Sequence, residues 1–256
     1  MPSHRDLILE QFTRQALPFS TTPGIKDEQA LRLLVDCTGA GSEDTLLDVA
    51  CGPGLVVCAF ARVARHATGI DLTPAMIERA RALQRKLGLS NVTWQVGDVL
   101  PLPYPAGSFS IVTSRFSFHH FPDPRAVLAE MRRVCVPGGK VAVADVVASP
   151  DPVKAAAFNR MEELRDPSHV RAMPLEELLG LFRIAGLPEP QVTGYRLKSE
   201  VEGLLARSFP EPGDADKIRQ MFLDSLADDG LGLGAFRKGS ELRFAYPVAI
   251  LVAEVG

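Results

Sequence analysis

The stretch Leu46-Leu47-Asp48-Val49-Ala50-Cys51-Gly52-Pro53-Gly54 is the part of the chain that decides its fold. Its first five residues form a short, mostly apolar run with one carboxylate, which is typical of a strand buried on both faces of a parallel sheet. Two glycines then flank a proline, and glycine permits left-handed backbone angles and close approach of a ligand. The pattern predicts a strand, a tight turn and a helix. It indicates either a ligand site at the carboxyl end of that strand or an ordinary strand-to-helix connection.

The composition is that of an ordinary globular protein and argues against several classes of partner. The 256 residues are 46% hydrophobic and 23% charged, which suits one large domain or one domain with a lid. A net charge of −3 gives no electrostatic reason to expect nucleic acid or an anionic membrane as a partner. No apolar run approaches the ~18 residues of a membrane span, and residues 1–10 lack the apolar segment of a signal peptide. The four cysteines form no Cys-x-x-Cys pair, so we expect a cytoplasmic protein with no bound metal.

From residue 45 to residue 147, predicted strands alternate with predicted helices. The strands are expected at residues 46–50, 66–71, 92–96, 109–113 and 140–147, the last after a turn at 137–139. The helices are expected at residues 55–64, 74–87 and 124–134. Alternation at this spacing predicts an α/β fold with a parallel sheet and right-handed crossovers.

The segments on either side of this core are predicted to be mostly helical. Before it, we expect a helix that stops at Pro18, as a lid or as an ordinary packed helix, and a second helix at 27–38. After it, we expect helices at 153–164, 174–185, 201–207 and 215–226, strands at 192–197 and 244–255, and a loose glycine-rich loop at 231–239. We therefore expect a single domain with N-terminal helices or a lid at 1–43, a ligand-binding core at 44–148, a helical lid and sixth-strand region at 149–212, and a C-terminal helix and last strand at 213–256.

The turn after the first strand fits a cationic ligand better than a pyrophosphate. The dinucleotide fingerprint Gly-x-Gly-x-x-Gly would need a third glycine at the position where Val57 stands. Asp48 also places an anion inside the strand that leads to the turn, and that anion would repel a pyrophosphate. S-adenosylmethionine carries an ammonium and a sulfonium but no phosphate, so it matches this pattern.

Two more carboxylates follow the next two predicted strands. Asp71 ends the second strand, at a spacing that suits hydrogen bonds to ribose hydroxyls. Asp98 follows the third strand, where it could accept a hydrogen bond from an adenine amino group, and Leu72 and Met76 would supply apolar walls for the purine. A single aspartate of this kind is more often a turn residue or a helix cap. Three at successive strand ends, with a glycine turn among them, indicate a binding site for S-adenosylmethionine.

Five segments, in order, carry a resemblance to a known family. They are Leu47-Asp48-Val49-Ala50-Cys51-Gly52-Pro53-Gly54, Gly69-Ile70-Asp71, Gly97-Asp98-Val99, Leu102-Pro103-Tyr104 with Ser108-Phe109-Ser110-Ile111-Val112, and Val136-Pro137-Gly138-Gly139-Lys140. This ordered set resembles the class I S-adenosylmethionine-dependent methyltransferases, in particular the branch of the ubiquinone and menaquinone biosynthesis methyltransferases and their small-molecule relatives. The resemblance implies a Rossmann-like sheet of seven strands, mostly parallel with the last strand antiparallel, and helices on both faces. It implies that the cofactor contacts Asp48, Ala50, Gly52, Gly54, Asp71, Asp98, Val99 and Ser114.

The segment after the fourth predicted strand should face the ligand and carry the chemistry. Methyl transfer from a sulfonium requires alignment of the nucleophile, and a base assists where the acceptor carries an acidic proton. His119 or His120 could be that base, or both could bond backbone carbonyls and shape the pocket. Arg115 could orient an anionic group of the substrate or pair with a carboxylate of the lid.

Other candidates for the substrate pocket lie mostly in the predicted lids. His169 stands among Arg165, Asp166 and Arg171, either as a substrate contact or as part of a surface salt-bridge cluster. Six aromatic residues could wall an apolar substrate pocket, although most such residues are ordinary core: Phe12, Phe19, Phe116, Phe118, Phe158 and Tyr195.

These features predict an enzyme that transfers the methyl group of S-adenosylmethionine to a small molecule and releases S-adenosylhomocysteine. The expected acceptor is quinone-like, aromatic or a secondary metabolite. Whether the protein forms a homodimer is left open by the sequence. Two alternatives are an enzyme of the same fold with a non-methylating reaction such as a cyclisation, and a non-enzymatic protein that binds S-adenosylmethionine. Nucleic-acid methylation is disfavoured, because Ser114-Arg115-Phe116-Ser117 stands where an Asn/Asp-Pro-Pro-aromatic sequence would be expected.

Overall fold

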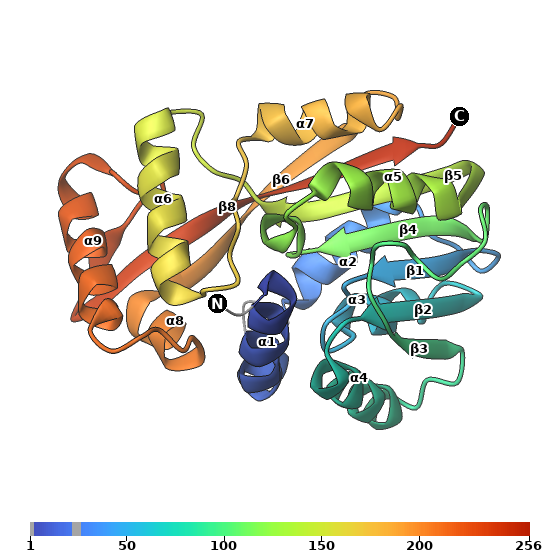
Figure 1. Ribbon diagram of the computed structural model, residues 1–256, viewed down its shortest axis with the longest axis horizontal. Coiled ribbons are helices and arrows are strands. Elements are labelled where there is room, and N and C mark those ends of the chain that lie inside the picture. The colour runs from blue at the N-terminus through green and yellow to red at the C-terminus, as the bar shows by residue number, and fades with distance from the viewer. Residues whose placement is uncertain (1–2, 22–26) are drawn as a thin grey trace.

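The computed structural model describes residues 3–21 and 27–256, with side chains for residues 3–17 and 27–256. Within these residues, eight strands form one sheet in the order β3-β2-β1-β4-β5-β8-β6, with β7 paired to the first residues of β8 (Figure 1). The strands are β1 (Thr45–Val49), β2 (His66–Asp71), β3 (Val92–Val96), β4 (Phe109–Arg115), β5 (Cys135–Val146), β6 (Gln191–Glu200), β7 (Phe236–Lys238) and β8 (Glu241–Glu254). Strands β1 to β5 pair in parallel with one another, whereas β8 is antiparallel to both β5 and β6. The prediction of a Rossmann-like, mostly parallel sheet with an antiparallel last strand is confirmed, and the short β7 is an addition to it.

Helices cover both faces of the sheet (Figure 1). On one face lie α5 (Pro124–Val134) and α7 (Leu175–Ile184), whose apolar residues share a core with β1, β4, β5 and β8. On the other face lie α2 (Glu28–Thr38), α3 (Leu55–Phe60) and α4 (Pro74–Leu87). Two helix starts follow from local capping, because Asp27 accepts hydrogen bonds from backbone N–H groups of α2 and Asp123 does so for α5.

The outer halves of β6 and β8 extend past the rest of the sheet and carry a separate group of helices. Residues 243–247 of β8 pair with β6 but lie beyond the part of β8 that pairs with β5. Three helices pack on this extension around Phe158, Phe222 and Phe244, namely α6 (Pro152–Arg165), α8 (Val201–Arg207) and α9 (Asp214–Asp228). The N-terminal helix α1 (His4–Thr21) lies between this extension and α4, in contact with α4 and α8 (Figure 1).

Two predicted helix ends are wrong. α1 continues past Pro18, because a proline removes one N–H group from the hydrogen-bond ladder without always ending the helix. α3 ends at Phe60 rather than at residue 64, because the backbone N–H groups of Arg62 and Val63 donate to carbonyls three residues back and not four. The side-chain amide of Asn91 then donates hydrogen bonds to the carbonyls of Ala61 and Ala64 beyond the helix end.

Two predicted connections are also wrong. Residues 137–139 belong to β5 and do not form a turn before it, because the backbone of Val255 bonds to this segment on both sides. The glycine-rich segment 231–239 is not loose. Leu231 and Leu233 are buried in the core of the extension, and their burial fixes the chain there.

Candidate functional site

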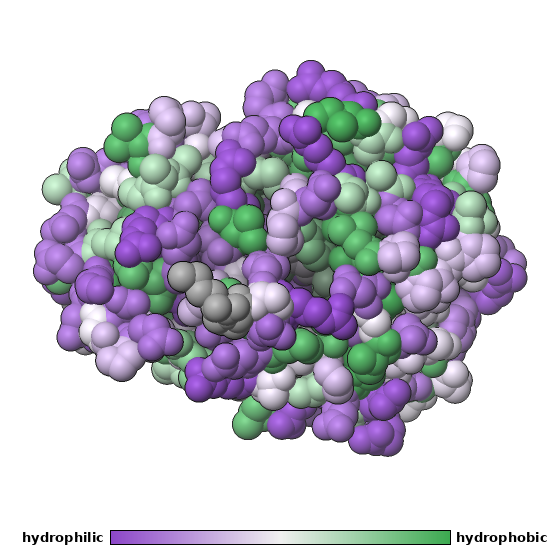
Figure 2. Space-filling view, in the orientation of Figure 1, coloured by the Kyte–Doolittle hydropathy of each residue, from purple (hydrophilic) through white to green (hydrophobic). Residues whose placement is uncertain are grey.

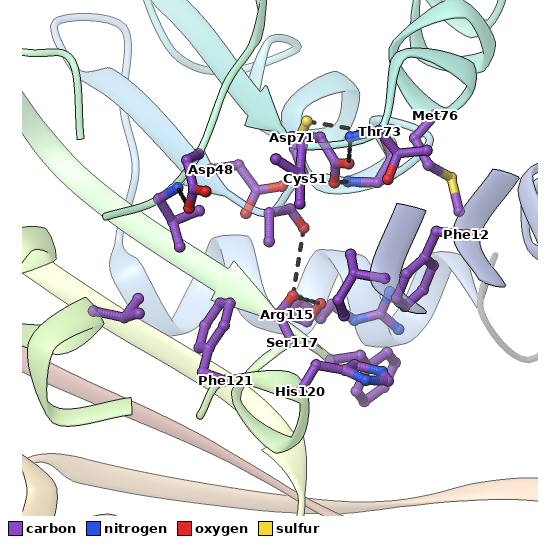
Figure 3. Close-up of a pocket in the computed structure, with 18 of the residues that line it drawn as sticks. Phe12, Asp48, Cys51, Asp71, Thr73, Met76, Arg115, Ser117, His120 and Phe121 are labelled. Carbon is purple, nitrogen blue, oxygen red and sulfur yellow. Dashed lines mark hydrogen bonds between the residues drawn. The ribbon is translucent and has the colours of Figure 1, made fainter. Parts of the chain in front are cut away.

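A cavity of about 350 Å³, here called the first cavity, lies at the carboxyl ends of β1, β2 and β4, where α1 covers it (Figure 3). Figure 2 shows a hollow near the centre of this face, with both hydrophobic and hydrophilic residues at its edge. This is the edge at which open α/β sheets bind ligands. Many of the predicted site residues line the cavity: Phe12, Asp48, Ala50, Gly52, Asp71, Leu72, Met76, Asp98, Val99, Arg115 and His120.

The turn after β1 presents mostly backbone to this cavity. Gly52 has a φ of +52°, and a Cβ added there would meet no atom within 4 Å. Ala50 holds a φ of 56° without being glycine, so the turn stores backbone strain where it borders the cavity. Gly54 does not line the cavity, and a Cβ there would lie 2.4 Å from the ring of Trp94 on β3. The structure gives Gly54 a packing role, and its predicted contact with the cofactor stays a prediction.

Asp71 connects the end of β2 to the glycine turn. Its two carboxylate oxygens accept hydrogen bonds of 2.8 Å from the backbone N–H groups of Gly52 and Thr73. Burial raises the pKa of Asp71, and these two hydrogen bonds oppose that shift. A carboxylate oxygen has two lone pairs, so each still has one available. Asp71 is therefore held in place and able to accept hydrogen bonds from a ligand in the first cavity.

Asp48 is a buried carboxylate on β1. The hydroxyl of Thr113 on β4 donates to it at 2.8 Å, and only 2% of Asp48 is exposed. Burial raises the pKa of Asp48 to about 7, while the Thr113 hydrogen bond and the charge of Arg115 oppose the shift. A cation in the cavity would favour the ionised carboxylate. The charge of this wall therefore fits an ammonium or a sulfonium and does not fit a phosphate.

The third predicted carboxylate, Asp98, meets a residue of α1. Arg5 forms an ion pair with Asp98, which also accepts a hydrogen bond from the backbone N–H of Val99. Nearby, the ring of His4 donates from Nε2 to the carbonyl of His120 at 2.8 Å. The first cavity is thus closed by residues from the start of the chain. Nothing in the N-terminal sequence pattern shows which strand ends the helix will cover. The position of His4 and Arg5 at the first cavity is therefore not predictable from it.

A second, smaller cavity of about 90 Å³ adjoins the first. Phe12, Phe116 and His120 line both cavities and so form the partition between them. His119, in the 3₁₀ turn η1 (Phe118–His120), lines only the second cavity. Its Nδ1 lies 2.6 Å from Oδ1 of Asp145 on β5. The structure therefore places a histidine with a carboxylate partner just beyond the partition.

The pKa values of the two adjacent histidines are shifted in opposite directions. Burial alone would lower the pKa of His119, but the charge and hydrogen bond of Asp145 raise it above the ordinary value of 6.5. His120 donates from Nδ1 to the carbonyl of Ser168 at 3.0 Å, and burial beside His119 lowers its pKa to about 4. A general base works best when its pKa lies near the working pH. Asp145 therefore keeps His119 a stronger base than a free imidazole, whereas the low pKa of His120 makes it a weak one.

His169 is not part of a surface salt-bridge cluster, so that alternative interpretation is wrong. The residue is buried, and its Nε2 donates to Oδ1 of Asn159 at 2.8 Å. Its neighbour Arg165 pairs with Glu162. The reason is that the segment after α6 is bonded to η1, because the backbone N–H groups of Val170 and Arg171 both donate to the carbonyl of His119. His169 lines neither cavity, although its ring centroid lies 5.6 Å from that of His119.

Two other predicted site residues also line neither cavity. Phe118 is 2% exposed and packs in the core on the α5 side of the sheet. The hydroxyl of Ser114 donates to the carbonyl of Val49 at 2.9 Å, which ties β4 to β1. Phe19 falls outside the residues whose side chains are described.

Arg115 borders the first cavity from the end of β4 (Figure 3). Its guanidinium carbon lies 4.2 Å from the centroid of the Phe116 ring, which is a cation–π arrangement. Burial raises the pKa of Tyr195 on β6, a residue that lines neither cavity, and the charge of Arg115 opposes that shift.

Two negative observations apply to the described part of the chain. No group of three or more His, Cys, Asp or Glu side chains in it is placed to hold a metal ion. In the same part, no helix combines the length and the apolar character needed to cross a membrane.

Comparison with known proteins agrees with this geometry. The model of a methyltransferase domain family matches residues 47–143. The uncharacterized methyltransferase YcgJ of Bacillus subtilis is 29% identical over 218 residues, which cover 85% of this chain and 86% of YcgJ. The uncharacterized protein YafE of Escherichia coli is 34% identical over 149 residues, which cover 58% of this chain and 72% of YafE.

Solved structures show the same fold. The crystal structure of YcgJ superposes with a TM-score of 0.81 at 26% identity, over 88% of this chain and 97% of that chain. The cyclase SpnF superposes with a TM-score of 0.62 at 23% identity, over 90% of this chain and 82% of that chain, which shows the fold alone. The matched family domain covers the strands that build the first cavity, and the identity with YafE extends over most of that protein. The chain belongs to the class I S-adenosylmethionine-dependent methyltransferases, and S-adenosylmethionine is its cofactor.

Proposed function

We propose that this enzyme methylates a hydroxyl group of a small molecule, with His119 as the general base. The observation that carries the proposal is the 2.6 Å contact between His119 Nδ1 and Asp145, at the wall of a cavity that adjoins the first cavity. When bound, the cofactor supplies an electrophilic methyl group. The protein then has to hold the acceptor oxygen in line with that methyl group and to take up the proton that the hydroxyl loses.

Asp145 prepares His119 for this role. One oxygen of Asp145 accepts the Nδ1–H of His119, and the other accepts its backbone N–H at 3.2 Å. A neutral ring with its proton on Nδ1 has a lone pair on Nε2, where it can accept a proton from the acceptor. Asp145 is 1% exposed, so its negative charge is little screened by water and stabilises the imidazolium that forms.

We assign the first cavity to the cofactor. In this assignment Asp48 balances the charge of the ammonium, Asp71 accepts hydrogen bonds from the ribose, and Asp98 accepts one from the adenine. Leu72 and Met76 form apolar walls for the purine. The ion pair between Asp98 and α1 is largely exposed, so a ligand can replace or join it at a small cost in free energy.

We assign the role of lid to residues 149–212. Six residues of this segment line the second cavity: Glu162, Arg165, Asp166, Leu197, Leu204 and Arg207. The N-terminal helix contributes Phe12 and Gln15 to the same cavity. Movement of either segment would open the second cavity to an acceptor.

A non-methylating reaction such as a cyclisation is the second candidate, because the cyclase SpnF has the same fold. The His119–Asp145 pair favours methyl transfer, since it provides a proton acceptor beside the cofactor cavity. The two candidates differ in stoichiometry. Methyl transfer releases one S-adenosylhomocysteine for each product, whereas a cyclisation releases none.

The test is a transfer assay with S-adenosylmethionine labelled in its methyl group and a panel of phenols, alcohols, hydroxy acids and amines. We expect labelled O-methyl products and one S-adenosylhomocysteine per product. Label that enters only amines or carbon centres would contradict the proposal. So would the absence of S-adenosylhomocysteine binding by calorimetry.

A further inference from the structure

The second cavity holds many charges for a space of about 90 Å³. It lies among α1, η1, α6, α8 and β8, and charged side chains from the helical extension line it: Glu162, Arg165, Asp166 and Arg207. Burial of a charge is unfavourable unless the charge has a partner. The partner of each of these groups therefore indicates which ligand the cavity can accept.

Both carboxylates are partnered by the protein itself. One oxygen of Glu162 accepts a hydrogen bond from the Tyr246 hydroxyl at 2.8 Å, and the other accepts two from Arg165. Asp166 accepts a hydrogen bond from the side chain of Gln15 at 3.1 Å and two more from the turn that follows α6. Neither carboxylate needs a cation from a ligand.

The two arginines differ from each other. The charge of Arg165 is balanced by Glu162 inside the protein. Arg207, the last residue of α8, donates a hydrogen bond of 2.8 Å to the neutral hydroxyl of Ser199 and forms no ion pair with any carboxylate in the described residues. Burial lowers the pKa of Arg207, as expected for a cation that water solvates poorly. Arg207 is thus a cation in the cavity wall whose hydrogen-bond partner in the described residues is a neutral hydroxyl, while the carboxylates of Glu200 and Glu162 act on it from beyond ion-pair distance.

We propose that Arg207 binds a carboxylate of the methyl acceptor, so that the substrates are small hydroxy acids and not neutral alcohols or phenols. This inference rests on the proposed function, because it places the acceptor hydroxyl against His119 in the same cavity. A guanidinium offers a planar fork of N–H donors that matches the two oxygens of a carboxylate. A cavity of about 90 Å³ is smaller than the ~150 Å³ that hold one benzene molecule, so the part of the acceptor that enters it is small.

Charge balance and geometry point to the same class of acceptor. A carboxylate would give Arg207 the direct ion pair that no carboxylate of the described residues forms with it, whereas a neutral acceptor would leave it with the hydroxyl of Ser199. Contact at two points, the carboxylate with Arg207 and the hydroxyl with His119, would also fix the direction of the acceptor oxygen. Alignment of that oxygen is the main requirement for the displacement.

The test measures binding to enzyme that is first saturated with S-adenosylhomocysteine. The probes are small aliphatic and aromatic hydroxycarboxylic acids, each paired with its neutral carboxamide, and the measurement is isothermal titration calorimetry. We expect at least one acid to bind the wild type about tenfold or more tightly than its amide. Arg207→Gln should weaken binding of that acid by about tenfold or more and leave the amide unchanged. Arg207→Lys should recover part of the affinity, because it restores the charge without the fork.

The control variant is Arg160→Gln, on the exposed side of α6, which should change neither acid nor amide binding. The comparison of acid with amide in the wild type needs no variant and tests the class of acceptor. If Arg207→Gln does not fold, Arg207→Lys tests the residue, because it keeps the charge and should still lower the affinity for the acid. The inference is overturned if no acid exceeds its amide in the wild type, or if Arg207→Gln binds the best acid as tightly as the wild type does. Failure of the wild type to bind S-adenosylhomocysteine would instead overturn the proposed function, and this inference with it.

Discussion

The two cavities that meet at Phe12, Phe116 and His120 are built in different ways. Most of the first cavity comes from the ends of neighbouring parallel strands and the turns after them, so short motifs contain its main polar groups. The second cavity comes from α1, η1, α6, α8 and β8, which only the folded chain brings together. The first cavity is therefore encoded mostly by local sequence, whereas the second cavity depends on how distant helices pack.

The largest effect on catalysis is expected when His119 is replaced. His119→Asn should lower kcat by about 10²- to 10⁴-fold, the usual contribution of a general base, and leave the affinity for S-adenosylhomocysteine nearly unchanged. His120→Asn should lower kcat by less than about tenfold, because a pKa of about 4 makes His120 a poor base near neutral pH. Steady-state kinetics measure both effects. Equal losses in the two variants would remove His119 from its assigned role.

At Asp71 we expect the main effect on cofactor affinity and not on kcat. Asp71→Asn should weaken binding of S-adenosylhomocysteine by about 1–3 kcal/mol, or about 5- to 150-fold, because charged hydrogen bonds to the ligand are lost. The fluorescence of Trp94, the single tryptophan, can report this binding, since its ring packs against the glycine turn. Unchanged affinity would exclude Asp71 from the cofactor site.

The pH dependence of cofactor binding tests whether Asp48 balances the charge of the cofactor's ammonium group. The pKa of Asp48 is about 7 in the free protein, and a cationic ligand favours the ionised carboxylate. Below pH 7, binding must therefore release a proton from Asp48, so affinity for S-adenosylhomocysteine, which keeps the ammonium, should fall by up to about tenfold per pH unit. Calorimetry between pH 5 and 8 measures this slope. Asp48→Asn should show a flat profile, and an equal slope in that variant would contradict the assignment.

The smallest effect is expected at the strained residue of the glycine turn. Ala50 has a φ of 56°, which an alanine adopts at a cost of about 1–2 kcal/mol, while glycine adopts it freely. Ala50→Gly should raise the free energy of unfolding by up to about 1 kcal/mol, because greater freedom of glycine in the unfolded chain offsets part of the relief. Urea denaturation measures it. A clear loss of stability would show that Ala50 is not strained.

Much of the first cavity is predictable from sequence, for a physical reason. Asp48 and Asp71 lie in strands and Asp98 closely follows one, and the ends of parallel strands meet at one edge of the sheet. Gly54 shows the limit of such reasoning. Its sequence neighbours suggest a ligand contact, but the atom that forbids a side chain there belongs to Trp94 on β3, which only the folded sheet places beside it.

The second cavity is not predictable in the same way. His119 stood out as one of two candidate bases, but its partner Asp145 follows 26 residues later, and the pairing of β4 with β5 brings the two together. In sequence, Arg207 is a charged residue at the end of a helix, like many exposed arginines. Its place in the cavity depends on the packing of α8 against β6 and β8, which no local pattern contains.

The most direct test of the central claim is the pH dependence of the methyl-transfer rate in a single turnover, for the wild type and for Asp145→Asn. The wild-type rate should rise with pH as His119 loses its proton, with a midpoint above 6.5, because Asp145 raises the pKa of His119. Without the carboxylate, burial dominates, so the midpoint of Asp145→Asn should move to lower pH while the maximal rate falls. A variant with the wild-type midpoint would contradict the assignment of His119 and Asp145 as the catalytic base and its partner.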